Sequence, residues 1–165
     1  MGKTYIGIDN GVSGAVAIIT GAGESLLFST PTRKEQSYTK TKQQISRVDF
    51  LKMYDLLKIH GDAANAMCLI ERPYANPQGM KATVSAMRAL EATLIAVEML
   101  DIAYCYIDSR EWQKALLPSG LKGPELKSGS LQIGCRLFPQ LKDEIEKQKD
   151  ADALLIAEYG RRQNL

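Results

Sequence analysis

The stretch that decides the fold is Tyr5-Ile-Gly-Ile-Asp-Asn-Gly-Val-Ser13, which continues through Gly14 into Ala15-Val-Ala-Ile-Ile19. Its two β-branched apolar runs have the length of buried strands. Gly11 and Gly14 are predicted to supply the positive φ angles of a hairpin turn between them. Asp9 then stands where the first strand ends. A carboxylate there costs desolvation free energy unless it has a cation or donor partner, and the simpler alternative is an Asp that caps its own turn.

Length and composition restrict the class of protein. The 165 residues, 45% of them hydrophobic, fit one domain over residues 1–165 with a substantial core. A net charge of +2 is too small to indicate a polyanionic partner by itself. The 3 cysteines have no CxxC spacing, which predicts reduced core thiols. No apolar run approaches membrane-spanning length and no targeting peptide is visible, so we expect a soluble, cytoplasmic protein without a membrane partner.

Periodicity and turn residues predict the remaining elements. Strands are expected at 25–30, 66–70 and 102–107, and helices at 48–59, 81–100, 109–117, 131–138 and 150–159. Ser109 is the expected N-cap of its helix, and Gly160 is expected to end the last one. The polar segments 33–47 and 118–128 are predicted to be loops, and 142–149 a loop or frayed end. This order predicts an α/β fold in which the first and fourth strands are neighbours.

Acidic residues stand at the ends of these elements. Asp9 ends the first strand, Glu71 ends the fourth, and Asp150 and Asp152 begin the last helix. In a mixed sheet Asp9 and Glu71 would share a site at one edge. Oxygen ligands suit Mg²⁺, and the single histidine excludes a His-rich zinc site. Two such ions about 4 Å apart would activate a water and stabilise the leaving oxygen of a phosphodiester.

Five motifs extend this pattern over nearly the whole chain: Ile6-Gly-Ile-Asp-Asn-Gly-Val-Ser-Gly-Ala15, Leu69-Ile-Glu-Arg-Pro73, Trp112-Gln-Lys114, Leu137-Phe-Pro139 and Ala151-Asp-Ala-Leu-Leu-Ile-Ala-Glu-Tyr-Gly160. In them the sequence resembles the RuvC-type Holliday-junction resolvases of the ribonuclease H-like fold, and it looks closest to their phage and organellar branch. The resemblance implies a five-stranded mixed sheet of order 3-2-1-4-5 flanked by helices. It also implies a homodimer, in a bacterial or phage-infected cell, that binds four-way DNA junctions. Such a dimer nicks two opposing strands symmetrically, with two Mg²⁺ or Mn²⁺ ions per active site.

By this resemblance, three residues take the positions of catalytic, metal-binding carboxylates: Asp9, Glu71 and Asp152. The fourth acid departs from the bacterial pattern, because Lys149 stands three residues before Asp152, where bacterial members have an Asp. We expect Asp150 to be the fourth ligand, as the N-cap of the last helix. Glu146 and Asp143 are the alternatives.

Basic side chains in predicted loops or at a helix end are expected to contact DNA phosphates: Lys40, Lys42, Lys81, Lys122, Lys127, Arg161 and Arg162. The loop 74–80 lies beside the predicted acid site. It is either a plain connector or a segment that inserts Tyr74 and Met80 between bases at the junction centre. One face of the helix 81–100 is either core or, as the resemblance implies, the dimer contact.

Other classes of protein compete with a DNA resolvase. The start of the chain also resembles the first phosphate loop of actin-like ATPases and sugar kinases, but those proteins need two lobes and this chain is too short. An RNA-processing nuclease of the same fold would use the same metal chemistry. A catalytically inactive junction-binding protein would explain Lys149. A structure-selective endonuclease that resolves four-way junctions is the hypothesis we prefer.

Overall fold

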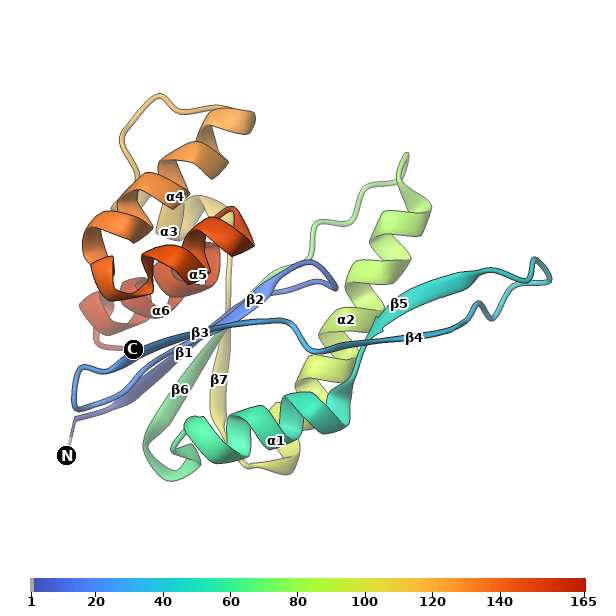
Figure 1. Ribbon diagram of the computed structural model, residues 1–165, viewed down its shortest axis with the longest axis horizontal. Helices are drawn as coiled ribbons and strands as arrows, with labels where there is room; N and C mark the ends of the chain where they lie inside the picture. Colours follow the sequence, from blue (N-terminus) through green and yellow to red (C-terminus); the bar gives the residue numbers. More distant parts are fainter. Residues whose placement is uncertain (1) are drawn as a thin grey trace.

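The computed structural model describes residues 2–165, which contain a central five-stranded sheet in the order β3-β2-β1-β6-β7 (Figure 1). Its strands are β1 (Thr4–Asp9), β2 (Ala15–Ile19), β3 (Ser25–Ser29), β6 (Ala66–Glu71) and β7 (Ala103–Ile107). β1 pairs antiparallel with β2 and parallel with β6, so the sheet is mixed, as predicted. The predicted order 3-2-1-4-5 differs in its numbering, because two further strands precede β6 in the chain.

Those two strands, β4 (Thr32–Gln36) and β5 (Gln44–Val48), form a separate antiparallel ribbon that projects from the sheet (Figure 1). The prediction of a loop over 33–47 is therefore wrong. Most side chains of the ribbon are polar and exposed, so no apolar alternation marks its strands in the sequence. We call this segment, residues 32–48, the ribbon.

Helices cover both faces of the sheet (Figure 1). One layer contains α1 (Phe50–His60) and α2 (Met80–Met99). The other contains α3 (Ser109–Leu116), α4 (Pro124–Leu137), α5 (Lys142–Gln148) and α6 (Asp152–Gln163). Short 3-10 turns occupy Ala63–Asn65 and Pro139–Leu141. Among the helices of residues 2–165, none has both the length and the apolar character needed to cross a bilayer.

Alternation along β1 assigns its side chains to the two layers. Ile6 and Ile8 pack in the core beneath α1 and α2, whereas Tyr5 belongs to the core beneath α6. Gly7 lies against α6 so closely that a Cβ at this position would be 2.1 Å from the carbonyl oxygen of Ala153. Asp9 is the next residue on the α6 side of the strand. The close packing of β1 on α6 therefore determines what Asp9 faces.

Two predicted roles of glycine are corrected. Gly11 has the expected positive φ, 155°. Gly14 does not, and its role is a close approach, because a Cβ there would lie 2.0 Å from the Asp9 carbonyl oxygen. Gly160 does not end the last helix. It lies inside α6, where its missing side chain leaves space for Leu69 of the sheet.

Three predicted boundaries in the second helical layer are also wrong. Asp108, not Ser109, is the N-cap of α3, and it forms a capping box with Glu111. α4 begins at Pro124, within the segment expected to be a loop, and so Lys127 is helical. Residues 142–148 form α5, whose only buried apolar side chain is Ile145. A helix with a single buried side chain has no apolar stripe to detect.

Candidate metal centre

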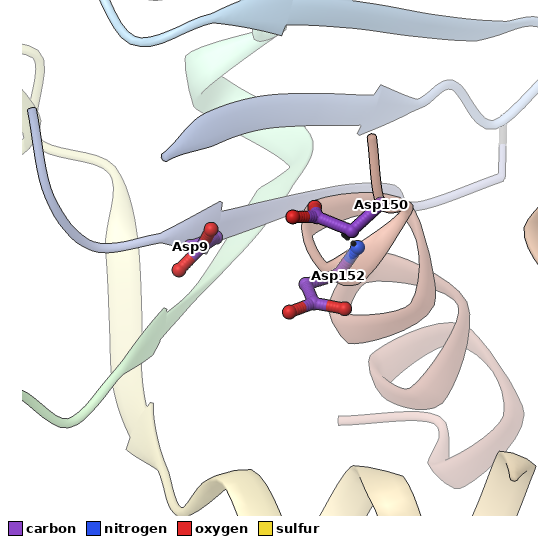
Figure 2. Close-up of side chains that lie close together, drawn as sticks. All are labelled: Asp9, Asp150 and Asp152. Atoms are coloured by element: carbon purple, nitrogen blue, oxygen red, sulfur yellow. Dashed lines mark hydrogen bonds between the residues drawn. The ribbon is translucent and has the colours of Figure 1, made fainter. Parts of the chain in front are cut away.

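Three aspartates meet at the edge of the sheet where β1 ends (Figure 2). Asp9, Asp150 and Asp152 each offer a carboxylate oxygen, and these oxygens all lie within 4.8 Å of one another. Figure 2 shows Asp9 on the strand facing the two aspartates at the start of α6. Residues far apart in sequence thus form one acidic cluster.

The start of α6 is held in place by α4. The buried hydroxyl of Ser130 donates a hydrogen bond to Asp152 Oδ1 and accepts one from the backbone N–H of Ala151 at 3.1 Å. Asp152 is the first residue of α6, where the helix dipole favours a negative charge. Asp150 precedes the N-cap, which is Ala151, so the prediction that Asp150 itself is the N-cap is wrong. Asp150 does lie outside the helix, as predicted, and this position lets it share a site with Asp152.

Glu71 lies beside this cluster but not within it. β1 and β6 are parallel, and Ile8 lies opposite Ile70. Asp9 and Glu71, the next residue of each strand, therefore lie side by side where the two strands end. Trp112 Nε1 donates a hydrogen bond of 3.0 Å to Glu71 Oε1. One oxygen of Glu71 is therefore oriented by α3, and the other is free of the tryptophan.

Burial and the charges of neighbouring carboxylates make Asp9, Glu71 and Asp152 hard to ionise. Burial raises the pKa of Asp9 to about 8, and the charges of Glu71, Asp152 and Asp150 add to the rise. Burial also raises the pKa of Asp152 to about 6, although its hydrogen bond from Ser130 opposes this change. The pKa of Glu71 is raised by burial and lowered in part by the Trp112 hydrogen bond. The site needs added positive charge to hold all its carboxylates ionised.

Lys127 supplies one such charge from α4. Its Nζ lies 2.9 Å from Asp150 Oδ2, and the side chain of Asp150 is only 5% exposed whereas that of Lys127 is 70% exposed. The hydrogen bond to Asp150 raises the pKa of Lys127, so the lysine remains protonated. The sequence marks Lys127 as a candidate phosphate contact. Its pairing with Asp150 had no local signal, because the two residues are 23 positions apart.

The donor set fits a hard divalent cation. Mg²⁺ binds oxygen at about 2.0–2.1 Å, so two ligand atoms on opposite sides of one ion lie roughly 4.2 Å apart, which is within the 4.8 Å limit that the oxygens of this cluster satisfy. All the ligand atoms of the cluster are carboxylate oxygens, which suit Mg²⁺ or Mn²⁺ better than Zn²⁺. The aspartates can therefore hold such an ion with small side-chain movements.

The alternative fourth ligands lie elsewhere. Glu146 is 53% exposed and pairs with Lys142 along α5 at 3.7 Å. Asp143 is exposed in the first turn of the same helix. Gln148, at the end of α5, donates hydrogen bonds of 3.1 Å to the carbonyls of Ser13 and Gly14, which ties this helix to the β1–β2 turn. Asp150 is the upstream acid that the structure brings to Asp9 and Asp152.

The residues predicted to contact DNA are distributed over several elements. Tyr74 and Met80 are 81% and 65% exposed, in the loop that follows Glu71 and at the start of α2, where Lys81 is also exposed. Lys40 and Lys42 are exposed at the tip of the ribbon, and Lys122 is exposed just before α4. These side chains are all accessible to a ligand.

Arg161 and Arg162 are different. Both pair at 2.7 Å with Glu158, a buried carboxylate, near the end of α6 opposite Asp152. They have a structural task there, because an unpaired buried charge is costly. They are also separated from the acidic cluster by the length of α6. The structure does not bring them to the candidate site.

The mixed sheet with a helical layer on each face is an α/β fold, and the acidic cluster lies at the ends of its strands. The sequence matches no family model, and a search of curated proteins finds no relative. Among solved structures, Thermus thermophilus RuvC in complex with a Holliday junction substrate is 15% identical, with a TM-score of 0.62 over 97% of this chain and 96% of that chain. A second Thermus thermophilus RuvC structure is 14% identical, with a TM-score of 0.55 over 98% and 96%. The fold is RuvC-like.

Proposed function

We propose that this protein is a structure-selective DNA endonuclease that resolves four-way junctions by divalent-metal-dependent phosphodiester hydrolysis. The observation that carries the proposal is the convergence of Asp9, Asp150 and Asp152 beside Glu71 at one sheet edge. The RuvC-like fold supports it, since a structure with the same fold is a complex with a Holliday junction. The chain is then an endodeoxyribonuclease that uses Mg²⁺, with Mn²⁺ as a substitute.

Two ions per site would be held by the three aspartates and by the Glu71 oxygen that Trp112 does not contact. Bound divalent cations supply activation of a water molecule and stabilisation of the leaving oxygen. Ser130 holds Asp152 in a fixed orientation, and Trp112 does the same for Glu71. Lys127 neutralises Asp150 and, with most of its side chain exposed, can turn towards a substrate phosphate once cations occupy the cluster.

Junction selectivity requires more than the acidic cluster. Tyr74 and Met80 are exposed, in the loop that follows Glu71 and at the start of α2, and are suited to contact bases at the junction centre. We propose a homodimer, so that two such sites cut two opposing strands symmetrically.

The ending Ala151–Gly160 supports a place in the phage and organellar branch. An RNA-processing role would use the same cluster, and the assay below separates the two polymers.

A junction-binding protein without nuclease activity is the second candidate. The observation that favours it is the ion pair of Lys127 with Asp150, which occupies one ligand of the cluster. In that case the lysine would replace the metal permanently. Strand nicking would be absent at any concentration of Mg²⁺ or Mn²⁺ although junction binding persists.

The test is a nicking assay on a mobile four-way junction with Mg²⁺, beside linear duplex DNA and structured RNA. The proposal expects paired nicks in opposing strands of the junction, little cutting of the duplex, and no cutting in EDTA. Preferential cutting of RNA would favour the RNA-processing nuclease. Junction binding without nicks in either metal would favour the binding protein.

A further inference from the structure

A pocket lies between the ribbon and the first half of α2, apart from the acidic cluster. Its volume is about 210 Å³. Val12, Ile45, Val84 and Ala89 supply apolar walls, and hydroxyl and amide side chains of the ribbon supply polar ones. An apolar cavity of about 150 Å³ admits benzene, so this pocket has room for one aromatic ring system such as a nucleobase.

Positive charge is concentrated at this pocket by an unusual pairing. Glu35 of β4 accepts ion pairs from three arginines: Arg88 at 3.0 Å, Arg47 at 3.3 Å and Arg33 at 3.7 Å. One carboxylate neutralises one of the three guanidinium groups, so the four side chains together keep a net charge of about +2. Arg47 and Arg88 also line the pocket, together with Lys81. Each guanidinium has five N–H donors and retains several for a second anion.

Tyr38 provides an aromatic surface at the same place. Its side chain is 72% exposed, and the guanidinium carbon of Arg88 lies 5.4 Å from its ring centroid. A large exposed aromatic ring beside free guanidinium donors is the arrangement that proteins use to stack a base while they bind the adjacent phosphate. Because most of the Tyr38 side chain is exposed, packing in the core does not explain why a large aromatic residue stands at this position.

The pocket is close to the acidic cluster along the chain. Val12 lines it and is three residues after Asp9, a distance that a chain spans in at most about 11 Å. Asn10, between them, donates a hydrogen bond of 3.1 Å to the Ala86 carbonyl of α2. The turn that follows Asp9 is therefore attached to the helix that forms one wall of the pocket. The part of the pocket that Val12 lines is therefore within about 11 Å of Asp9.

We propose that the pocket between the ribbon and α2 binds one unpaired nucleotide of the substrate strand, with its base on Tyr38 and its phosphate on Arg47 and Arg88. This inference rests on the proposed function for the identity of the strand. A paired base within a duplex cannot enter a pocket of this size, so the pocket selects single-stranded or opened DNA, the form found at a branch point. The ribbon then holds the strand next to the acidic cluster.

The test measures binding without cleavage, by fluorescence anisotropy of a fluorescein-labelled single-stranded oligo(dT) in EDTA, with a labelled duplex in parallel. Tyr38→Ala should weaken single-strand binding at least fivefold, because stacking on one aromatic side chain is worth that much or more. Tyr38→Phe should stay within twofold of the wild type. Arg88→Gln should weaken it several-fold.

Matched controls come from other parts of the molecule. Tyr104 is a partly exposed tyrosine on the edge strand β7, and Arg136 is an exposed arginine of α4, in the opposite helical layer. Tyr104→Ala and Arg136→Gln should bind oligo(dT) as the wild type does. Unchanged binding by Tyr38→Ala, or an equal loss for single strand and duplex, would overturn the proposal. Failure of the wild type to nick junctions in Mg²⁺ would instead reject the nuclease function, since this binding assay contains no metal.

Discussion

Replacing Asp9 with Asn should stabilise the metal-free protein near neutral pH. The folded protein raises the pKa of Asp9 from 3.8 to about 8, mainly through burial. The folded state therefore binds this proton more tightly than the unfolded state, and the resulting stability is fully present below pH 3.8 and lost as pH rises through about 8. Each pKa unit corresponds to about 1.4 kcal/mol, so the three units between pH 4 and pH 7 cost the fold about 4 kcal/mol.

Asparagine removes the titrating group but remains a buried polar side chain, so we expect a net gain of roughly 2–4 kcal/mol at pH 7 to 8. For a chain of this size that gain raises the melting temperature by roughly 4–16 °C. The assay is thermal unfolding followed by circular dichroism at pH 4.5, 6, 7 and 8 in EDTA. Asp55→Asn, an exposed position in α1, is the control and should change little.

The gain from Asp9→Asn should grow with pH, and saturating Mg²⁺ should stabilise the wild type more than the variant, because binding favours the ionised carboxylate. A variant that is less stable than the wild type at pH 8 in EDTA would refute the reasoning. So would a gain that is the same at every pH, since it could not come from the loss of a titrating carboxylate.

Further predictions concern packing, the fourth ligand and the ribbon. Gly7→Ala should lower the free energy of unfolding, measured in urea, by about 3 kcal/mol or more, because the new Cβ meets the backbone of α6. Gly160→Ala should lower it clearly less, because there the new Cβ meets the flexible end of Leu69, and equal losses would contradict this packing. Asp150→Asn should reduce Mg²⁺ affinity at least tenfold in calorimetry, whereas Glu146→Gln, at an exposed position, should leave it unchanged. The reverse result would show that the fourth ligand is Glu146 of α5. Changing Lys40 and Lys42, at the tip of the ribbon, to Glu should lower the slope of log affinity for the junction against log salt concentration by about 2. An unchanged slope would place the tip away from DNA.

The sequence predicts the strand ends of the site well. Asp9 and Glu71 each end an apolar run, and strand length and parallel pairing are local or nearly local properties. Asp152 could be placed only through the family resemblance. Its meeting with Asp9 depends on α6 packing on β1 at Gly7, a long-range contact that periodicity does not encode.

The parts that sequence reasoning missed share a physical cause. The ribbon has no apolar alternation, because most of its side chains are polar and the ion pair of Glu35 with Arg88 helps to connect it to α2. Ser130 and Lys127 point at the start of α6 from α4, and nothing near them in sequence distinguishes them from surface residues of an amphipathic helix. Interactions between side chains of separate elements need the tertiary structure to be seen.

The most direct test of the central claim compares wild type and Asp9→Asn on one labelled four-way junction in Mg²⁺, with cleavage and binding measured on the same samples. We predict paired nicks by the wild type, loss of at least a hundredfold in cleavage rate for Asp9→Asn, and junction affinity equal to or tighter than that of the wild type, because a negative charge near the phosphates is removed. Cleavage by Asp9→Asn at the wild-type rate would contradict the account, because the acidic cluster would then not be the site of hydrolysis.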